Sequence, residues 1–169
     1  MNIGLINNWN SVVSPTDTVY HLGDFALGPK QLWRDYRDAL NGTIKFILGN
    51  HDTINDKTLQ ALTSIMHEGD TIHDELVYYT PGGAIIHLAH VPPEGDHKGR
   101  GYTRAGMPML PGYDLLMCGH VHTNWLIHYY NEKPVVNVGV DRWGYTPRTL
   151  DEILKLDGLI SITLPQRQP

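Results

Sequence analysis

The sequence has little cysteine and no long hydrophobic run. Its single cysteine, Cys118, excludes a disulfide bond within the 169 residues. No stretch of about 20 apolar residues is suited to crossing a membrane. The first residues also lack the basic segment followed by an apolar run that marks a secretory signal. We therefore expect a cytoplasmic protein with no membrane partner.

Excess positive charge is absent as well. Thirteen Lys and Arg residues against 18 Asp and Glu residues give a net charge of −5 at pH 7. This balance argues against a surface that binds nucleic acids indiscriminately, although it allows a local basic groove around a small phosphorylated substrate. The length and the 41% hydrophobic content suit one core better than two. We expect a single domain over residues 1–169.

Apolar segments alternate with helix-like segments in the first half of the chain. Thr18–Leu22 is predicted to be a strand, followed by a helix from Pro29 to about residue 40. Thr43–Leu48 is a second predicted strand, followed by a helix over about residues 55–66. This order favours an α/β sheet, in which functional loops follow the carboxyl ends of the strands.

Paired strands dominate the second half. The turn residues Pro81-Gly82-Gly83 predict a hairpin between residues 71–80 and 84–89, and a second hairpin is predicted between residues 125–130 and 135–140. The connection over residues 91–113 is long for a compact domain, and we interpret it as a rim over the site. The remaining predicted elements are a helix at 2–13, a strand at 114–118, a helix at 150–156 and a strand at 159–164.

Candidate ligand residues follow four of these strands. The four motifs are Gly23-Asp24, Gly49-Asn50-His51-Asp52, His90 and Gly119-His120-Val121-His122. A glycine before a ligand lets the backbone approach a metal ion or a phosphate closely. Carboxylate, amide and imidazole groups together suit borderline divalent ions better than an all-thiolate zinc site.

Two of these motifs carry little information alone. Gly23-Asp24 is typical of an ordinary turn, and His90 is equally well explained as a strand-end histidine bonded to the backbone. The paired histidines of Gly119-His120-Val121-His122 favour metal ligation over a solvated turn. The ordered combination of the four motifs favours a metal site.

From Asp24 to His122, these motifs resemble the calcineurin-like metallophosphoesterase family. The family pattern is Asp-x-His, Gly-Asp, Gly-Asn-His-Asp, a lone His, and Gly-His-x-His. The resemblance implies an α/β sandwich of two mixed β-sheets flanked by helices. It also implies hydrolysis of phosphomonoesters or phosphodiesters, with nucleotides and cyclic nucleotides among the candidate substrates.

The resemblance assigns metal ligands. Asp24 would bridge two metal ions, His122 would serve one of them, and Asn50, His90 and His120 would complete the site of the other. The implied cofactor is a divalent metal, Mn²⁺ first, with Fe, Zn, Ni, Co and Mg as alternatives. Two ions are implied by the family, and a single ion is the alternative for this chain.

The resemblance also assigns catalytic groups. A metal-bound hydroxide would attack phosphorus, and His51 would stabilise or protonate the leaving oxygen. Asp52 would hold the imidazole of His51 in orientation. No substrate-binding residue is assigned.

The family's first motif is missing, because no Asp-x-His precedes Asp24. His21 is no substitute, since strand alternation places it on the opposite face from Asp24. We interpret the chain as N-terminally truncated relative to the family and as lacking the first core strand. A shortened chain, a split protein and a degenerate relative are three explanations, and a partner chain covering the sheet edge is one consequence. The alternative function is a catalytically impaired relative that binds a ligand or a partner protein.

Overall fold

The computed structural model describes residues 2–93, 112–156 and 159. Most of the predicted rim over residues 91–113 and all but one residue of the predicted strand at 159–164 lie outside these residues. In the described ranges, no helix is long and apolar enough to cross a membrane. The helices are α1 (Asn2–Val12), α2 (Trp33–Asp38), α3 (Asp56–Ser64) and α4 (Leu150–Ile153), with 3-10 turns η1 (Lys30–Leu32) and η2 (Val140–Arg142).

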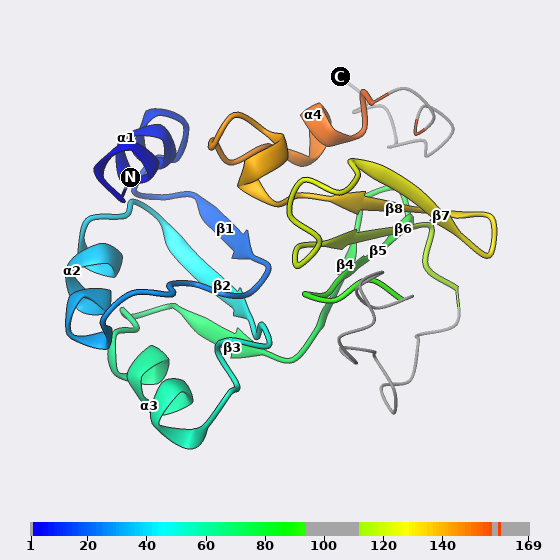
Figure 1. Cartoon of the computed structure of the whole chain (residues 1–169). Helices are drawn as coiled ribbons and strands as arrows, with labels where there is room; N and C mark the ends of the chain where they lie inside the picture. The colour runs from blue at the N-terminus through cyan, green and yellow to red at the C-terminus, as the bar shows by residue number, and fades with distance from the viewer. Residues whose placement is uncertain (1, 94–111, 157–158, 160–169) are drawn as a thin grey trace.

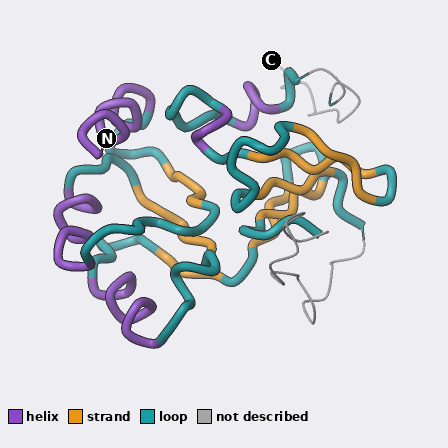
Figure 2. Tube along the Cα trace, in the orientation of Figure 1, coloured by secondary structure: helices purple, strands orange, loops and turns teal. Residues whose placement is uncertain are grey.

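The strands form two sheets, as Figures 1 and 2 show. The first sheet has the order β1-β2-β3 with parallel pairings, and the second has the order β4-β5-β6-β8-β7 with parallel and antiparallel pairings. The predicted α/β class with two sheets is confirmed. The strands are β1 (Thr18–His21), β2 (Thr43–Ile47), β3 (Thr71–His73), β4 (Leu76–Tyr79), β5 (Ile85–Leu88), β6 (Leu115–Cys118), β7 (Ile127–Tyr130) and β8 (Lys133–Asn137).

The central strand of the first sheet, β2, is buried on both faces. Ile44 and Phe46 pack with Trp33 and Leu62 in a core beneath α1, α2 and α3. Ile47 points to the other face, where it belongs to the core shared with the second sheet. The first sheet is therefore covered by helices on one side and by the second sheet on the other.

The core between the sheets uses residues from both. Leu22 at the end of β1 joins Leu88 of β5 and Met117 of β6, and Ile153 of α4 completes the cluster. Each of these side chains is at least about nine-tenths buried. Burying apolar side chains of this size stabilises the fold by about 1.5–3 kcal/mol each. This packing brings the ends of strands from the two sheets together.

The predicted strand over residues 71–80 is wrong as a single element. Residues 71–73 form β3 in the first sheet, and residues 76–79 form β4 in the second. The chain changes sheets at Asp74 and Glu75, and the carboxylate of Glu75 lies 2.7 Å from Nε2 of the buried His87. Both halves have strand-like composition, so the local pattern did not reveal the break. The β4–β5 hairpin itself is confirmed.

The second predicted hairpin is confirmed with shifted bounds. Asn131 and Glu132 form its turn, with φ of 48° and 64°. Positive φ at both positions is the geometry of a tight hairpin turn that matches the strand twist. Pro134 therefore lies inside β8, and the strand ends at Asn137 rather than at residue 140.

The predicted helix after β2 is confirmed as α3. Its N-cap is Asn55, whose side-chain oxygen accepts a hydrogen bond from the backbone N–H of Thr58 at 3.0 Å. The predicted helix from Pro29 is shorter than expected. It starts as the 3-10 turn η1 and continues as the six-residue α2.

A buried ion pair ties α2 to the first sheet. The guanidinium of Arg37 donates two hydrogen bonds of 2.8 Å to the carboxylate of Asp70, and both side chains are at most 1% exposed. The same carboxylate accepts from the backbone N–H groups of Ile44 and His67. Burial acts to raise the pKa of Asp70, but these hydrogen bonds, Arg37 first, outweigh it and lower the pKa.

Replacing Asp70 should therefore destabilise the fold strongly. Asp70→Asn leaves the Arg37 charge buried without a counter-ion, and we expect a loss of about 3–5 kcal/mol in the free energy of unfolding by urea titration. Asp38→Ala is the matched control, because it removes a half-exposed carboxylate from His67 and should cost less than about 1 kcal/mol. Equal losses in the two variants would contradict the role of the buried pair.

The stability that Asp70 contributes should depend on pH. Its pKa is lowered in the folded state, so the contribution is complete above the pKa of an unfolded aspartate, about 3.9, and decreases at lower pH. The stability difference between the unaltered protein and Asp70→Asn should shrink as the pH falls below about 4. A constant difference between pH 7 and pH 3 would rule out this linkage.

Candidate metal centre

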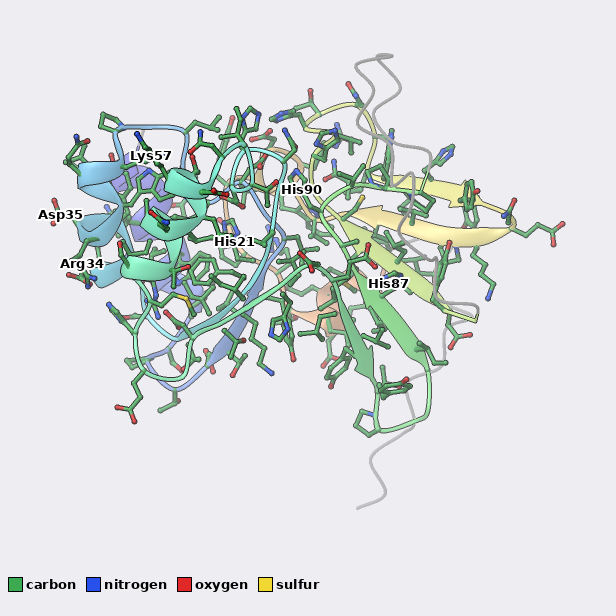
Figure 3. The ribbon with its side chains drawn as sticks, turned by 90° about the horizontal axis from the view of Figure 1, so that it is seen from below. His21, Arg34, Asp35, Lys57, His87 and His90 are labelled. Atoms are coloured by element: carbon green, nitrogen blue, oxygen red, sulfur yellow. The ribbon has the colours of Figure 1, made fainter. Side chains whose placement is uncertain are left out.

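The predicted ligand residues follow strands from both sheets. Asp24 follows β1 and Asn50 follows β2, which are parallel neighbours in the first sheet. His90 follows β5 and His120 follows β6, which are parallel neighbours in the second. Because the sheets pack against each other, these carboxyl ends meet between them, and Figure 3 shows His90 at that place.

Two glycines allow the loops to approach each other. A side chain at Gly23, where φ is +91°, would collide with the ring of His90 and with the backbone of Gly49. A side chain at Gly49 would collide with the carboxylate and backbone of Asp24. The glycines in these motifs are therefore required by close contact between the loops, as the sequence predicts.

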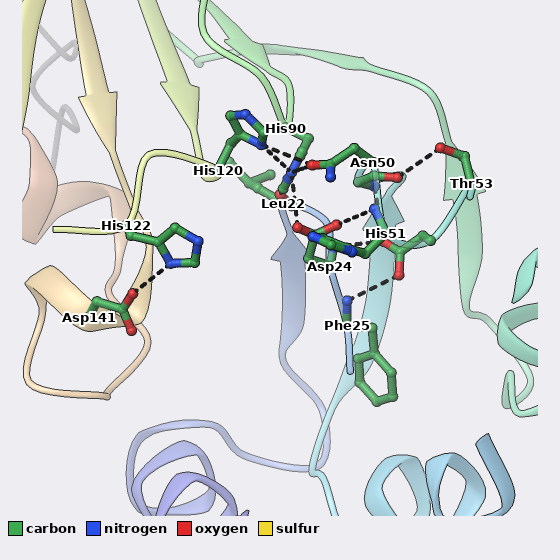
Figure 4. Close-up of polar contacts among 12 residues, drawn as sticks. Leu22, Asp24, Phe25, Asn50, His51, Thr53, His90, His120, His122 and Asp141 are labelled. Atoms are coloured by element: carbon green, nitrogen blue, oxygen red, sulfur yellow. Dashed lines mark hydrogen bonds and ion pairs between the residues drawn. The ribbon is translucent and has the colours of Figure 1, made fainter. Parts of the chain in front are cut away.

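Four potential ligand atoms converge at this point (Figure 4). Asn50 Oδ1 lies 3.0 Å from His90 Nε2 and 2.9 Å from His120 Nδ1, and the two histidine nitrogens lie 3.2 Å apart. Asp24 Oδ2 lies 3.3 Å from His90 Nε2. The ligand atoms of Asp24, His90 and His120 all lie within 4.8 Å of one another, so these side chains could bind a divalent metal ion.

The other ring nitrogen of His90 fixes the proton on its imidazole. Nδ1 lies 2.7 Å from the carbonyl oxygen of Leu22, which can only accept a hydrogen bond. Nδ1 must therefore carry a proton, and Nε2 of neutral His90 turns a lone pair towards the cluster. A backbone carbonyl behind a metal-binding imidazole is a common outer-shell contact.

The electrostatics of the cluster favour a cation. Burial acts to raise the pKa of Asp24, but the contact with His90 outweighs it and lowers the pKa. Burial acts to lower the pKa of His90, but the contact with Asp24 outweighs it and raises the pKa. Both shifts describe a site that favours added positive charge, which here means a proton on His90.

Three predicted ligands have an uncommon backbone conformation. Asp24, His120 and His122 have φ of 57°, 66° and 48°, in the left-handed region that non-glycine residues seldom adopt. Such residues often occur where a functional site constrains the backbone. In the loop after β1 and in the loop after β6, this conformation favours a functional site over an ordinary turn.

The expected role of Asp52 requires correction. Its carboxylate accepts hydrogen bonds from the backbone N–H groups of Asp24 at 2.7 Å, Gly49 at 2.9 Å and Phe25 at 3.2 Å. It is 2% exposed, and among the described residues it makes no hydrogen bond to the imidazole of His51. Asp52 therefore holds the two loops together instead of orienting His51.

His51 and His122 lie outside the four-atom cluster. The side chain of His51 is exposed, and its backbone N–H donates to Asp24 Oδ1 at 2.9 Å. His122 is 73% exposed, and its Nδ1 lies 3.1 Å from Asp141 Oδ2 (Figure 4). The sequence reasoning missed Asp141. It lies just beyond β8, which is parallel to β6, so the strand-end rule was the signal that could have found it.

Fold and site define an α/β protein with a candidate divalent-metal centre at the strand ends. No protein-family model matches the chain. The chain belongs to the family of the uncharacterized protein MJ1445 of Methanocaldococcus jannaschii. The two are 32% identical over 163 residues, which cover 92% of this chain and 74% of MJ1445.

Two further proteins are similar to this chain. The gene 66 protein of Mycobacterium phage L5 is 27% identical over 155 residues, covering 83% of this chain and 73% of the phage protein. A crystal structure of the protein of unknown function AQ665 from Aquifex aeolicus matches with a TM-score of 0.64 and 27% identity. That match covers 92% of this chain and 84% of AQ665, so the similarity extends over both sheets.

Removing the Asp52 carboxylate should affect metal binding as well as stability. Asp52→Ala leaves buried backbone N–H groups without a charged acceptor, which should cost about 3 kcal/mol or more in the free energy of unfolding. Because Asp24 and Gly49 lose their support, any affinity for a divalent ion such as Mn²⁺, measured by calorimetry, should also fall. The comparison variant is His51→Ala, which should keep Mn²⁺ affinity. Unchanged affinity in Asp52→Ala would contradict the assigned role.

Proposed function

We propose that this protein is a metal-dependent phosphoesterase with a calcineurin-like fold. The observation that carries the proposal is the convergence of Asp24 Oδ2, Asn50 Oδ1, His90 Nε2 and His120 Nδ1 from four strand ends. The packing of two sheets with helices outside the first supports the finer fold assignment. The proposed substrates are small phosphomonoesters or phosphodiesters, nucleotides and cyclic nucleotides among them.

The donor set suits a borderline divalent ion. Two imidazole nitrogens, one carboxylate and one amide oxygen fit Mn²⁺, our first choice, and also Fe, Zn, Ni, Co or Mg. When bound, such an ion supplies an activated water and polarises the phosphate ester. The four side chains would hold the ion at the strand ends, where Asp24, Asn50 and His120 are partly exposed.

His51 is the proposed proton donor to the leaving oxygen. It follows Asn50 directly, and its backbone N–H is fixed by Asp24, so its position is coupled to the metal ligands. Its side chain is exposed and makes no hydrogen bond among the described residues, which leaves the imidazole available to a substrate. A positioned general acid of this kind contributes about 100- to 10,000-fold to a rate.

A catalytically impaired binding protein is the second candidate. The observation that favours it is the position of His122, which pairs with Asp141 and is not among the close-set ligands Asp24, His90 and His120. Under this alternative, the cluster of Asp24, Asn50, His90 and His120 would bind one ion without efficient catalysis. The edge of β1, whose described sheet partner is β2 alone, is the proposed contact for a partner chain.

Metal analysis tests the centre directly. Asp24→Ala and His90→Ala each remove a ligand, and we expect both to lose bound Mn²⁺ by elemental analysis and calorimetry while remaining folded by circular dichroism. His67→Ala is the matched control, because it changes an exposed surface histidine. Full Mn²⁺ content in Asp24→Ala would exclude the proposed centre.

Hydrolysis of bis(p-nitrophenyl) phosphate separates the two functions. The Mn²⁺-loaded protein should turn this diester over, and His51→Ala should keep the metal while kcat falls about 100- to 10,000-fold. Mn²⁺ binding without hydrolysis would favour the catalytically impaired binding protein. Loss of metal in His51→Ala would contradict the role assigned to His51.

A further inference from the structure

Two exposed apolar side chains lie on the loops that follow β1 and β2. Leu27 is 72% exposed and Ile54 is 66% exposed, and among the large apolar side chains of the described residues only Ile3 and Tyr79 are comparably exposed. An isolated exposed apolar residue is common on protein surfaces. Here, however, the two lie on the same loops that carry the candidate metal ligands and the candidate proton donor.

The two loops are joined at both ends. Near the strands, the carboxylate of Asp52 in the loop after β2 accepts hydrogen bonds from two backbone N–H groups of the loop after β1. Further along the chain, Nζ of Lys30 donates to Oγ1 of Thr58 at 2.6 Å. Leu27 lies between these two connections on the first loop, and Ile54 lies between them on the second. Both apolar side chains therefore belong to one pair of joined loops.

Hydrogen bonds fix the backbone beside both side chains. The indole N–H of Trp33, which is 2% exposed, donates to the carbonyl of Gly28 at 3.2 Å. The backbone N–H and the hydroxyl of Thr53 both donate to the carbonyl of Gly49, at 3.2 Å and 3.0 Å. The exposure of the two apolar side chains is thus a property of held loops, and the loops do not fold over to bury them.

The surface between the two connections carries no charge. Residues 25–29 read Phe-Ala-Leu-Gly-Pro, and residues 53–55 read Thr-Ile-Asn. A charged group placed against these segments would lose water without gaining an opposite charge, whereas an apolar group would gain from leaving water. Ligand sites commonly combine such apolar contacts with a few polar groups that set orientation.

We propose that Leu27 and Ile54 bind the apolar part of the substrate's leaving alcohol. This inference rests on the proposed phosphoesterase function and names its substrate class, phosphate esters of neutral, apolar alcohols. His51, the proposed proton donor to the leaving oxygen, lies on the same loop as Ile54 and three residues before it. The leaving alcohol therefore lies on the side of the metal centre where the two apolar side chains are exposed.

The first measurement compares two phosphonates that cannot be hydrolysed. Calorimetry with the Mn²⁺-loaded protein should show 1-naphthylmethylphosphonate binding about 10-fold more tightly than methylphosphonate, because both offer the same phosphonate to the metal and only one offers an apolar group. Leu27→Ser and Ile54→Ser should each weaken naphthylmethylphosphonate binding about 3- to 10-fold and leave methylphosphonate binding unchanged. Val12→Ser is the matched control, because it changes an exposed aliphatic residue of α1 that precedes the amino end of β1.

The second measurement reads the contact without activity. In methyl ¹H–¹³C spectra, with Zn²⁺ in place of the paramagnetic Mn²⁺, naphthylmethylphosphonate should shift the methyl signals of Leu27 and Ile54. Methylphosphonate should leave these signals in place, and neither compound should move the methyl signals of Val12. A purely structural role of the two side chains would produce no such difference between the two compounds.

The outcomes separate this inference from the function on which it rests. Equal affinity for the two phosphonates, or unchanged affinity in both serine variants, would overturn the inference and leave the proposed function standing. A protein that sediments as a dimer and becomes monomeric in Leu27→Ser would make these side chains an interface between two copies, which also overturns it. If neither phosphonate binds the Mn²⁺-loaded protein, the proposed function fails and the inference fails with it.

Discussion

The carboxylate of Asp52 is the contact on which the geometry of the site depends. It accepts hydrogen bonds from backbone N–H groups in the loop after β1 and in the loop after β2, including those of Asp24 and Gly49. Only glycine at position 49 permits the resulting approach. Asp24 in turn accepts from the N–H of His51, so ligand and candidate acid are fixed relative to each other. A buried charge satisfied by several backbone donors is stable without a counter-ion.

The second sheet adds His90 and His120, whose ring nitrogens both lie close to Asn50 Oδ1. The carbonyl of Leu22 accepts a hydrogen bond from Nδ1–H of His90, which directs the remaining lone pair of that ring towards Asn50 Oδ1 and Asp24. Burial acts to lower the pKa of His90, but the contact with Asp24 outweighs it and raises the pKa, so the cluster favours a positive charge. A divalent ion bound here would compete with that proton, so its binding would be linked to proton release.

The strand ends carrying Asp24, Asn50, His90 and His120 were predictable, because each strand is a short, largely apolar segment and a candidate ligand residue follows it. The α/β fold class was predictable from the alternation of strand-like and helix-like segments along the chain. The role of Asp52 was not predictable, since its partners include N–H groups 27 and 28 residues away. The change of sheet after β3 was not predictable either. The two strands on either side of it, β3 and β4, both have strand-like composition, so the sequence shows no break between them. Such features are set by tertiary contacts that local patterns do not encode.

Left-handed residues occur in the loop after β1, a partly buried strand, and in the loop after β6, a fully buried one. A non-glycine residue in this conformation costs about 1–2 kcal/mol, and Asp24, His120 and His122 each adopt it. All four residues of β6 before His120 are buried, and the N–H of Gly119 donates to the carbonyl of His90 at 3.0 Å. The buried strand and this hydrogen bond anchor the loop that carries His120. Such contacts would hold the candidate ligand side chains in position without an ion, as a preorganised site requires.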